Sequence, residues 1–114
     1  RQGFADLGER LQVPVEPWRD SGLAGHHTHH QYVVRADRRD ALLAHLTEAG
    51  IGHAVYYPQP LHRQECFAHL GYAEGSLPEA ERASRETVAL PIYPELCGDE
   101  LVSVVETIRV FYRK

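Results

Sequence analysis

The stretch 31–51, QYVVRADRRDALLAHLTEAGI, changes its hydrophobic pattern along its length and so decides the fold class. Residues 31–36 are rich in aromatic and β-branched side chains, which predicts a strand. Three leucines then recur at helical spacing, which predicts a helix with Asp37 as its N-cap and Gly50 at its C-terminal stop: Leu42, Leu43 and Leu46. Ile51–Tyr57 is strand-like again, so the chain alternates strand, helix and strand.

The segment before this stretch predicts a weak helix and a connection. Residues 1–11 place Phe4, Leu7 and Leu11 on one helical face, but Gly3 and Gly8 lower the helix propensity by about 1 kcal/mol each. Prolines and glycines dominate residues 13–25, which is typical of an irregular connection.

The segment after it continues the alternation. We expect a short helix at 63–70, a helix beginning with Pro78, an extended segment at 88–94 and a last helix at about 99–112. The total is about three short strands and four or five helices. This pattern predicts an α/β domain (two-layer α+β) in which helices cover a small three-stranded sheet.

Composition excludes several classes of protein. With 114 residues, 43% hydrophobic residues and a net charge of −4, the chain fits one globular domain and has no basic stripe that would bind nucleic acid. No apolar run approaches the roughly 18 residues that a membrane span needs. Cys66 and Cys97 lie far apart, which favours reduced thiols and a cytoplasmic protein. Because methionine is absent, we expect a piece of a longer chain.

Five short motifs carry a resemblance to a known family. They are H-x-x-H-Q-Y at 27–32, Y-P-x-P-L-H at 57–62, L-G-Y at 70–72, L-P-x-A-E at 77–81 and L-P-I-Y-P-E-L at 90–96. In order and spacing they resemble the C-terminal part of the DegT/DnrJ/StrS family of pyridoxal-phosphate-dependent nucleotide-sugar aminotransferases. The resemblance implies a fold-type-I enzyme with a large cofactor domain and a small C-terminal domain. Residues 1–25 would then link to the missing large domain, and residues 26–114 would form the small one.

The resemblance also implies a reaction and its partners. The parent enzyme would move an amino group, from glutamate or glutamine, onto a keto sugar attached to a nucleotide, and it would work as a homodimer. Three alternatives stay open: a detached binding module that keeps the fold without chemistry, a metal-binding domain that uses the histidines, and the family's dehydratase relatives.

Lysine is almost missing from the chain. Transaminases hold pyridoxal phosphate on a lysine amine, which also transfers the protons. The single lysine is Lys114, the last residue, and no motif surrounds it. We therefore expect no catalytic residue in this chain, no covalently bound cofactor and no activity of the isolated piece.

Four residues are candidates for substrate binding: Tyr57, His62, His30 and Arg35. In the family the loop with Y-P-x-P-L-H lines the substrate pocket, and two prolines hold its side chains in place. Structural alternatives are that Tyr57 caps the core, that His62 caps the next helix and that Arg35 forms a surface ion pair. Glu81 is expected to compensate the positive end of its helix.

The histidine run at 26–30 raises the question of a metal site. His27 and His29 lie two residues apart, so on a strand they would point to one side and could share an ion. A structural zinc site needs four ligands, however, and both cysteines are distant in sequence. The run is best interpreted as the residues that lead into the strand, with His27 and His30 placed by the family pattern.

Overall fold

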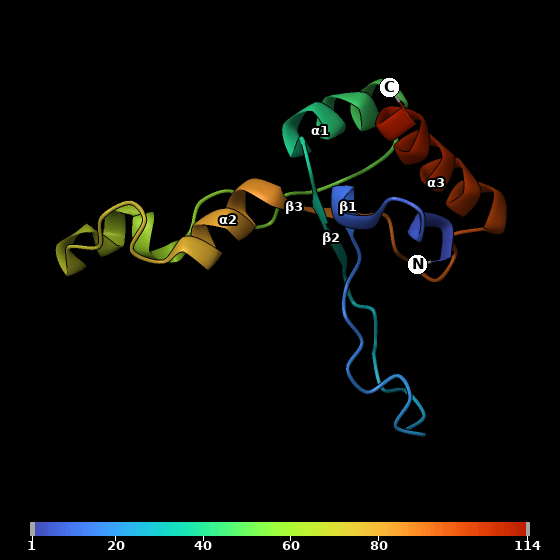
Figure 1. The fold of residues 1–114 in the computed structure, drawn as a ribbon, viewed down its shortest axis with the longest axis horizontal. Helices are drawn as coiled ribbons and strands as arrows, with labels where there is room; N and C mark the ends of the chain where they lie inside the picture. Colours follow the sequence, from blue (N-terminus) through green and yellow to red (C-terminus); the bar gives the residue numbers. More distant parts are fainter. Residues whose placement is uncertain (1, 114) are drawn as a thin grey trace.

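A computed structural model describes residues 2–113 and contains a small antiparallel sheet at its centre (Figure 1). The sheet has the order β1-β2-β3, formed by Leu11–Gln12, Tyr32–Ala36 and Thr87–Leu90. The central strand β2 pairs Ala36 with Leu11 on one side and Tyr32 with Leu90 on the other. The predicted three-stranded sheet with helices is therefore confirmed.

One predicted strand is wrong. Ile51–Tyr57 forms only an isolated bridge, in which Ala54 and Ala89 exchange two backbone hydrogen bonds of 3.1 and 2.8 Å. Pro58 and Pro60 follow directly and have no N–H to donate, so the pairing does not extend. The third strand is instead β1, within the segment expected to be a helix.

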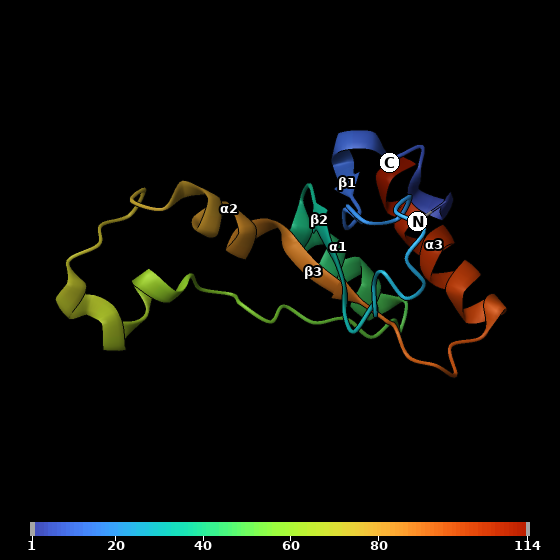
Figure 2. The ribbon, with the colours of Figure 1, turned by 90° about the horizontal axis from the view of Figure 1, so that it is seen from below.

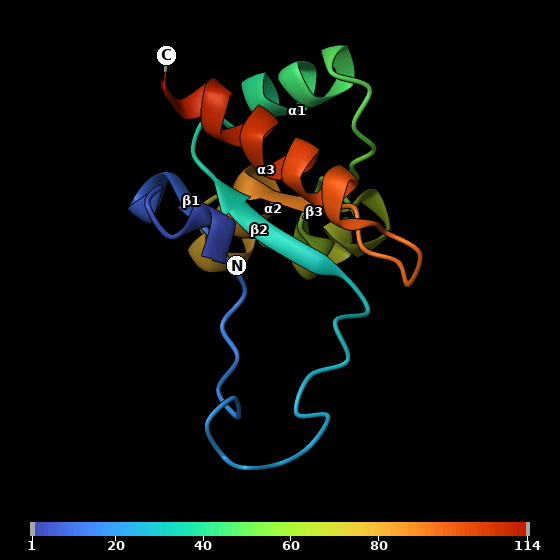
Figure 3. The ribbon, with the colours of Figure 1, turned by 90° about the vertical axis from the view of Figure 1, so that its right-hand side faces the viewer.

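Two helices cover one face of the sheet. They are α1, Arg39–Glu48, and α3, Gly98–Arg113, which lie side by side above the strands (Figures 1 and 3). The most deeply buried side chains come from both layers: Leu42 and Leu46 of α1, Ile108 of α3, Val34 of β2 and Val88 of β3. The predicted leucine face of α1 forms with Leu42 and Leu46 buried and Leu43 partly buried. The predicted last helix is confirmed as α3.

The third helix, α2, extends away from this core. It spans Pro78–Glu86, runs directly into β3 and lies on the opposite side of the strands from α3 (Figures 1 and 2). Pro78 occupies its first turn, and Glu79 and Glu81 lie near its N-terminus, as the sequence predicts.

Two predicted helices are replaced by tighter turns. Residues 1–11 contain the 3-10 helices η1, Gln2–Phe4, and η2, Gly8–Arg10. Gly8, the first residue of η2, has a φ of 55° that an α-helix cannot contain. The apolar face still forms, because Phe4, Leu7 and Leu11 are all buried.

The segment 61–70 likewise folds as η3, Leu61–Arg63, and η4, Glu65–Leu70. The end of the segment agrees with the expected boundary at residue 70, because Gly71 has a φ of 72° and ends η4.

Asp37 is not the N-cap of α1. Arg38 takes that position with a left-handed backbone, and no side chain bonds the free N–H groups there. Asp37 uses its backbone oxygen instead, which accepts a hydrogen bond from the Tyr112 hydroxyl at 2.7 Å.

The fold is more extended than its length requires. Its radius of gyration is 16.2 Å, whereas a compact chain of this size has about 13 Å. Two segments project from the core. Residues 13–31 form a long loop below it (Figure 3), and residues 57–77 extend to one side together with α2 (Figure 2). We call residues 57–77 the lobe. No helix within residues 2–113 is long and apolar enough to cross a membrane.

Candidate functional site

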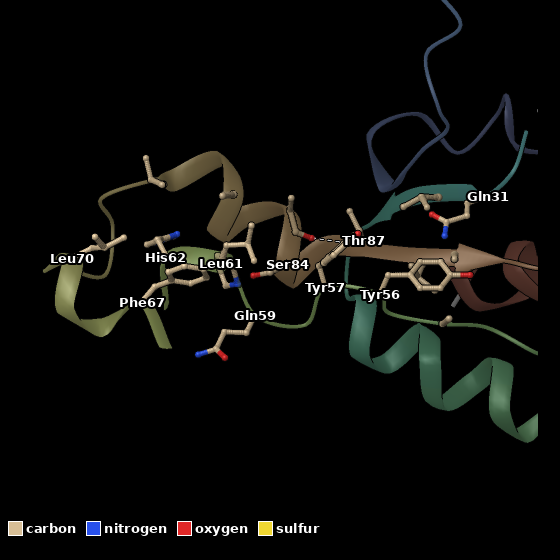
Figure 4. A pocket seen from close by; sticks show the side chains of 18 residues that line it. Gln31, Tyr56, Tyr57, Gln59, Leu61, His62, Phe67, Leu70, Ser84 and Thr87 are labelled. Atoms are coloured by element: carbon tan, nitrogen blue, oxygen red, sulfur yellow. Dashed lines mark hydrogen bonds between the residues drawn. The ribbon is translucent and has the colours of Figure 1, made fainter. Parts of the chain in front are cut away.

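The lobe and α2 enclose a cavity next to the sheet. From Tyr57 the chain runs past two prolines through η3 and η4, turns at Gly71 and returns to the start of α2. Between these segments and strands β2 and β3 lies a cavity of about 730 Å³, which we call the lobe cavity (Figure 4). Both prolines restrict the backbone of the loop, so its side chains are held before any ligand arrives.

The walls of the lobe cavity are mainly apolar. The helix α2 contributes a face of small residues, and the lobe contributes larger side chains such as Leu61, Phe67 and Leu70. The polar groups are few: Gln31, Tyr56, Tyr57, Gln59, His62, Ser84 and Thr87. Such a cavity fits a ligand or protein segment with extensive apolar surface and a small number of hydrogen-bonding groups.

Tyr57 and His62 both line this cavity, but in different environments. The side chain of Tyr57 is 72% exposed, and its hydroxyl makes no hydrogen bond within residues 2–113. His62 is 8% exposed and packs edge-on against Tyr72, with ring centroids 6.0 Å apart. Tyr57 is thus free to contact a ligand, whereas His62 is fixed.

Glu81 fixes His62. Its Oε1 lies 3.0 Å from Nε2 of His62, and both carboxylate oxygens accept the Gly75 backbone N–H at 2.9 Å. The Leu77 N–H lies 3.5 Å from Oε1. The expectation that Glu81 compensates its helix N-terminus is confirmed by that contact. The hydrogen bond to His62 was not predicted, because the two residues lie 19 positions apart and no spacing rule connects them.

The electrostatics of this group favour an ionised carboxylate. The Gly75 N–H holds the pKa of Glu81 below its ordinary value, burial opposes this effect, and His62 and Leu77 add to the lowering. A charged Glu81 can only accept hydrogen bonds.

Arg35 lies outside the lobe cavity. Its Nε and Nη2 donate to the same Glu86 oxygen at 3.1 and 2.7 Å, and both side chains are partly exposed. The pair lines a separate polar hollow of about 540 Å³ with Arg82 and Asp37. This arrangement matches the structural alternative for Arg35, a surface ion pair.

His30 lies in a third hollow. It is exposed and borders a space of about 280 Å³ together with His53, Tyr56 and Tyr93. Tyr56 also lines the lobe cavity, so the two spaces adjoin. The structure therefore brings Tyr57 and His62 together and leaves His30 and Arg35 apart from them.

The other histidines of the run at 26–30 contact one another or a neighbouring carboxylate. The rings of His27 and His29 stack with centroids 4.1 Å apart, and Nδ1 of His27 accepts the His29 backbone N–H. Nε2 of His26 lies 3.3 Å from a Glu16 carboxylate oxygen. Among residues 2–113, no three histidine, cysteine, aspartate or glutamate side chains are placed to hold a metal ion.

Residues 2–113 do not supply an anchor for pyridoxal phosphate. They contain no lysine, and Lys114 lies outside the described residues. The described part of the chain therefore offers no lysine amine for this aldehyde cofactor.

Comparison with known proteins identifies the family of the chain. The sequence profile of the DegT/DnrJ/EryC1/StrS aminotransferase family matches residues 1–109. The chain belongs to this family. The resemblance read from the motifs is therefore confirmed.

Three relatives show how much of an enzyme the chain represents. It is 54% identical over 77% of its length to a pleiotropic regulatory protein of Geobacillus stearothermophilus, and covers 24% of that protein. It is 39% identical over 94% of its length to a dTDP-3-amino-3,4,6-trideoxy-α-D-glucose transaminase of Micromonospora megalomicea, and covers 28%. DesV of S. venezuelae, solved in complex with a ketimine intermediate, superposes on 99% of the chain with a TM-score of 0.84 and 32% identity, over 29% of its own length. The chain thus spans about a quarter of these relatives.

Proposed function

We propose that this chain is the small C-terminal domain of a pyridoxal-phosphate-dependent aminotransferase that acts on a nucleotide-linked keto sugar. The observation that carries the proposal is the superposition of 99% of the chain on 29% of DesV. Relatives named as dTDP- and UDP-sugar transaminases support the substrate class. The amino donor would be glutamate or glutamine.

The proposal divides the chain into two parts. Residues 1–25 would lead from the large cofactor domain, and residues 26–114 would form the small domain that closes over the substrate. The whole enzyme would be a homodimer. Free, exposed thiols at Cys66 and Cys97 are suited to a reducing cytoplasm.

The ligand-binding part of the proposal rests on the lobe. Tyr57 would hydrogen-bond a sugar hydroxyl, and His62 would contact the ligand from the cavity wall. His30 borders the adjoining hollow and would contact the ligand only where the ligand extends into that space. Arg35 would bind a phosphate or carboxylate of the ligand only if its ion pair with Glu86 were broken. Bound pyridoxal phosphate supplies electron withdrawal during amino transfer. This chain would bind and orient the sugar and exclude water.

The test is to express the longer reading frame that contains residues 1–114 and assay it with glutamate and a panel of dTDP- and UDP-linked keto sugars. Formation of a nucleotide-linked amino sugar, detected by mass spectrometry, supports the proposal. Loss of water from the sugar without amino transfer would assign the protein to the dehydratase relatives. Sugar binding without turnover would instead support a binding module that keeps the fold without chemistry.

A further inference from the structure

Glu81 joins three separate segments through one carboxylate. It receives hydrogen bonds from η3 through His62 and from the turn before α2 through Gly75, with Leu77 at the limit of contact. The side chains of Glu81 and His62 are 8% and 5% exposed, so water competes little for these bonds. Within the described chain, this carboxylate connects the cavity-lining part of the lobe to the helix that forms the opposite wall.

The chemistry of the pair determines the proton position on His62. An ionised carboxylate accepts hydrogen bonds and cannot donate them, so the contact at 3.0 Å requires a proton on Nε2. A neutral imidazole then carries no proton on Nδ1, which keeps a lone pair. With Nε2 occupied by Glu81, any polar contact between His62 and a ligand must use Nδ1.

We propose that Glu81 is a positioning residue that keeps the proton of the neutral His62 ring on Nε2 and so leaves Nδ1 as a hydrogen-bond acceptor for a ligand hydroxyl in the lobe cavity. The role in ligand binding rests on the proposed function, while the proton position does not. A ligand with a free hydroxyl fits such an acceptor, and a ligand with only acceptor atoms does not. A carboxylate that orients a histidine in this way acts through the ring and never touches the ligand.

The proton position can be measured without any substrate. In the chain labelled with ¹⁵N-histidine, long-range ¹H–¹⁵N spectra at about pH 8, where free imidazole is neutral, should show His62 with a proton on Nε2 alone. An Nδ1–H form or an imidazolium at this pH would overturn the proposal. This measurement uses the wild-type sequence, so it tests the proton position even if substitution of Glu81 prevents folding.

A matched pair of variants tests the cause. Glu81→Gln offers one oxygen in place of two and an amide that also donates, so His62 should become a mixture of its two neutral forms. Glu79→Gln removes a charge from the same turn of α2. Within residues 2–113 the Glu79 carboxylate pairs with Arg82 and not with His62, so this variant should leave His62 unchanged. An unchanged His62 spectrum in folded Glu81→Gln would show that the carboxylate does not set the proton.

Kinetics of the intact enzyme test the role in binding. Glu81→Gln and His62→Ala should each lower kcat/KM for the nucleotide sugar by about 2- to 13-fold, the effect of one lost hydrogen bond. The double variant should be no worse than either single one, because both remove the same contact. Glu79→Gln should behave as wild type. Multiplicative losses in the double variant would show that Glu81 acts independently of His62 and would overturn the positioning role.

Discussion

The hydroxyl of Tyr112, near the end of α3, donates a 2.7 Å hydrogen bond to the backbone oxygen of Asp37, in the turn before α1. The two residues are 75 positions apart, and Tyr112 is 3% exposed. Burial raises the pKa of Tyr112 to about 12, and the nearby Asp37 charge adds to this effect. The bond therefore connects the last helix to the first through a phenol that must stay neutral.

Tyr112→Phe should have opposite effects on stability at neutral and at high pH. At pH 8 the variant should lose about 0.5–1.5 kcal/mol of unfolding free energy, the value of one hydrogen bond. Above pH 10 the unfolded phenol ionises while the folded one stays neutral, so the contribution of Tyr112 declines as the pH rises to about 12. Two pH units correspond to about 3 kcal/mol.

The unfolding free energy of the wild type should therefore fall below that of Tyr112→Phe as the pH approaches 12. Urea titrations of both proteins between pH 8 and 12 would measure this. The other tyrosines are common to both proteins and cancel in the difference. A constant gap across this range would contradict a buried, neutral phenol.

Gly3→Ala should destabilise the fold. A Cβ at Gly3 would lie 2.8 Å from Cγ1 of Val105, a stiff side chain on α3 that has little freedom to move. Overpacking of this kind costs about 1–3 kcal/mol. Gly52→Ala is the control, because nothing lies within 4 Å of its added Cβ, and it should be neutral or slightly stabilising. Thermal unfolding of both variants would compare them, and equal midpoints would show that η1 does not pack on α3 as described.

Local sequence signals predicted the parts of the fold that have a clear period. Strand β2 follows its run of β-branched residues, and α3 follows its apolar spacing. The strand β1 was missed because two residues, Leu11 and Gln12, carry no period, and only pairing with β2 defines them. Ile51–Tyr57 had the composition of a strand, but the prolines after it left one bridge.

Part of the geometry of the candidate site was predictable from the sequence. The motifs group Tyr57 and His62 on one loop, and both line the lobe cavity, while their contact with substrate stays a prediction. The partner of Arg35 was not predictable, because Glu86 is 51 positions away and becomes its neighbour only when α2 runs into β3. The leucines in and after the proline-containing segment, Leu61 and Leu70, were the sequence signal that could have predicted an apolar cavity.

Arg35→Ala and Glu86→Ala should have similar, small effects on stability. The ion pair is partly exposed, and such pairs contribute about 0–1 kcal/mol. A double-mutant cycle by urea unfolding would measure the coupling, and neither single variant should change sugar kinetics by more than about 2-fold. A large loss of kcat/KM in Arg35→Ala, with Glu86→Ala neutral, would assign the guanidinium to the substrate instead.

Leu61→Asn should reduce self-association of the 114-residue chain. Leu61 is 64% exposed on the lobe cavity, beside other exposed apolar side chains such as Leu70. Contiguous apolar surface of this kind promotes association. Leu23→Asn is the matched control, since Leu23 is 63% exposed on residues 13–31 and lies outside the cavity. Sedimentation velocity should show fewer oligomers for Leu61→Asn alone, and an equal effect of both variants would remove the cavity as the cause.

Tyr57→Phe, in the intact enzyme, should lower kcat/KM for the nucleotide sugar by about 2- to 13-fold, because one hydrogen bond to an uncharged group is lost. The hydroxyl is exposed and makes no bond within residues 2–113, so folding should be unaffected. Cofactor content, read from its visible absorbance, and the half-reaction with the amino donor should also stay at wild-type values, because the large domain would hold the cofactor. This pattern separates a ligand contact from a structural role. Unchanged sugar kinetics in a folded Tyr57→Phe enzyme would remove Tyr57 from the binding site, and equal losses in both half-reactions would point to a general distortion of the enzyme.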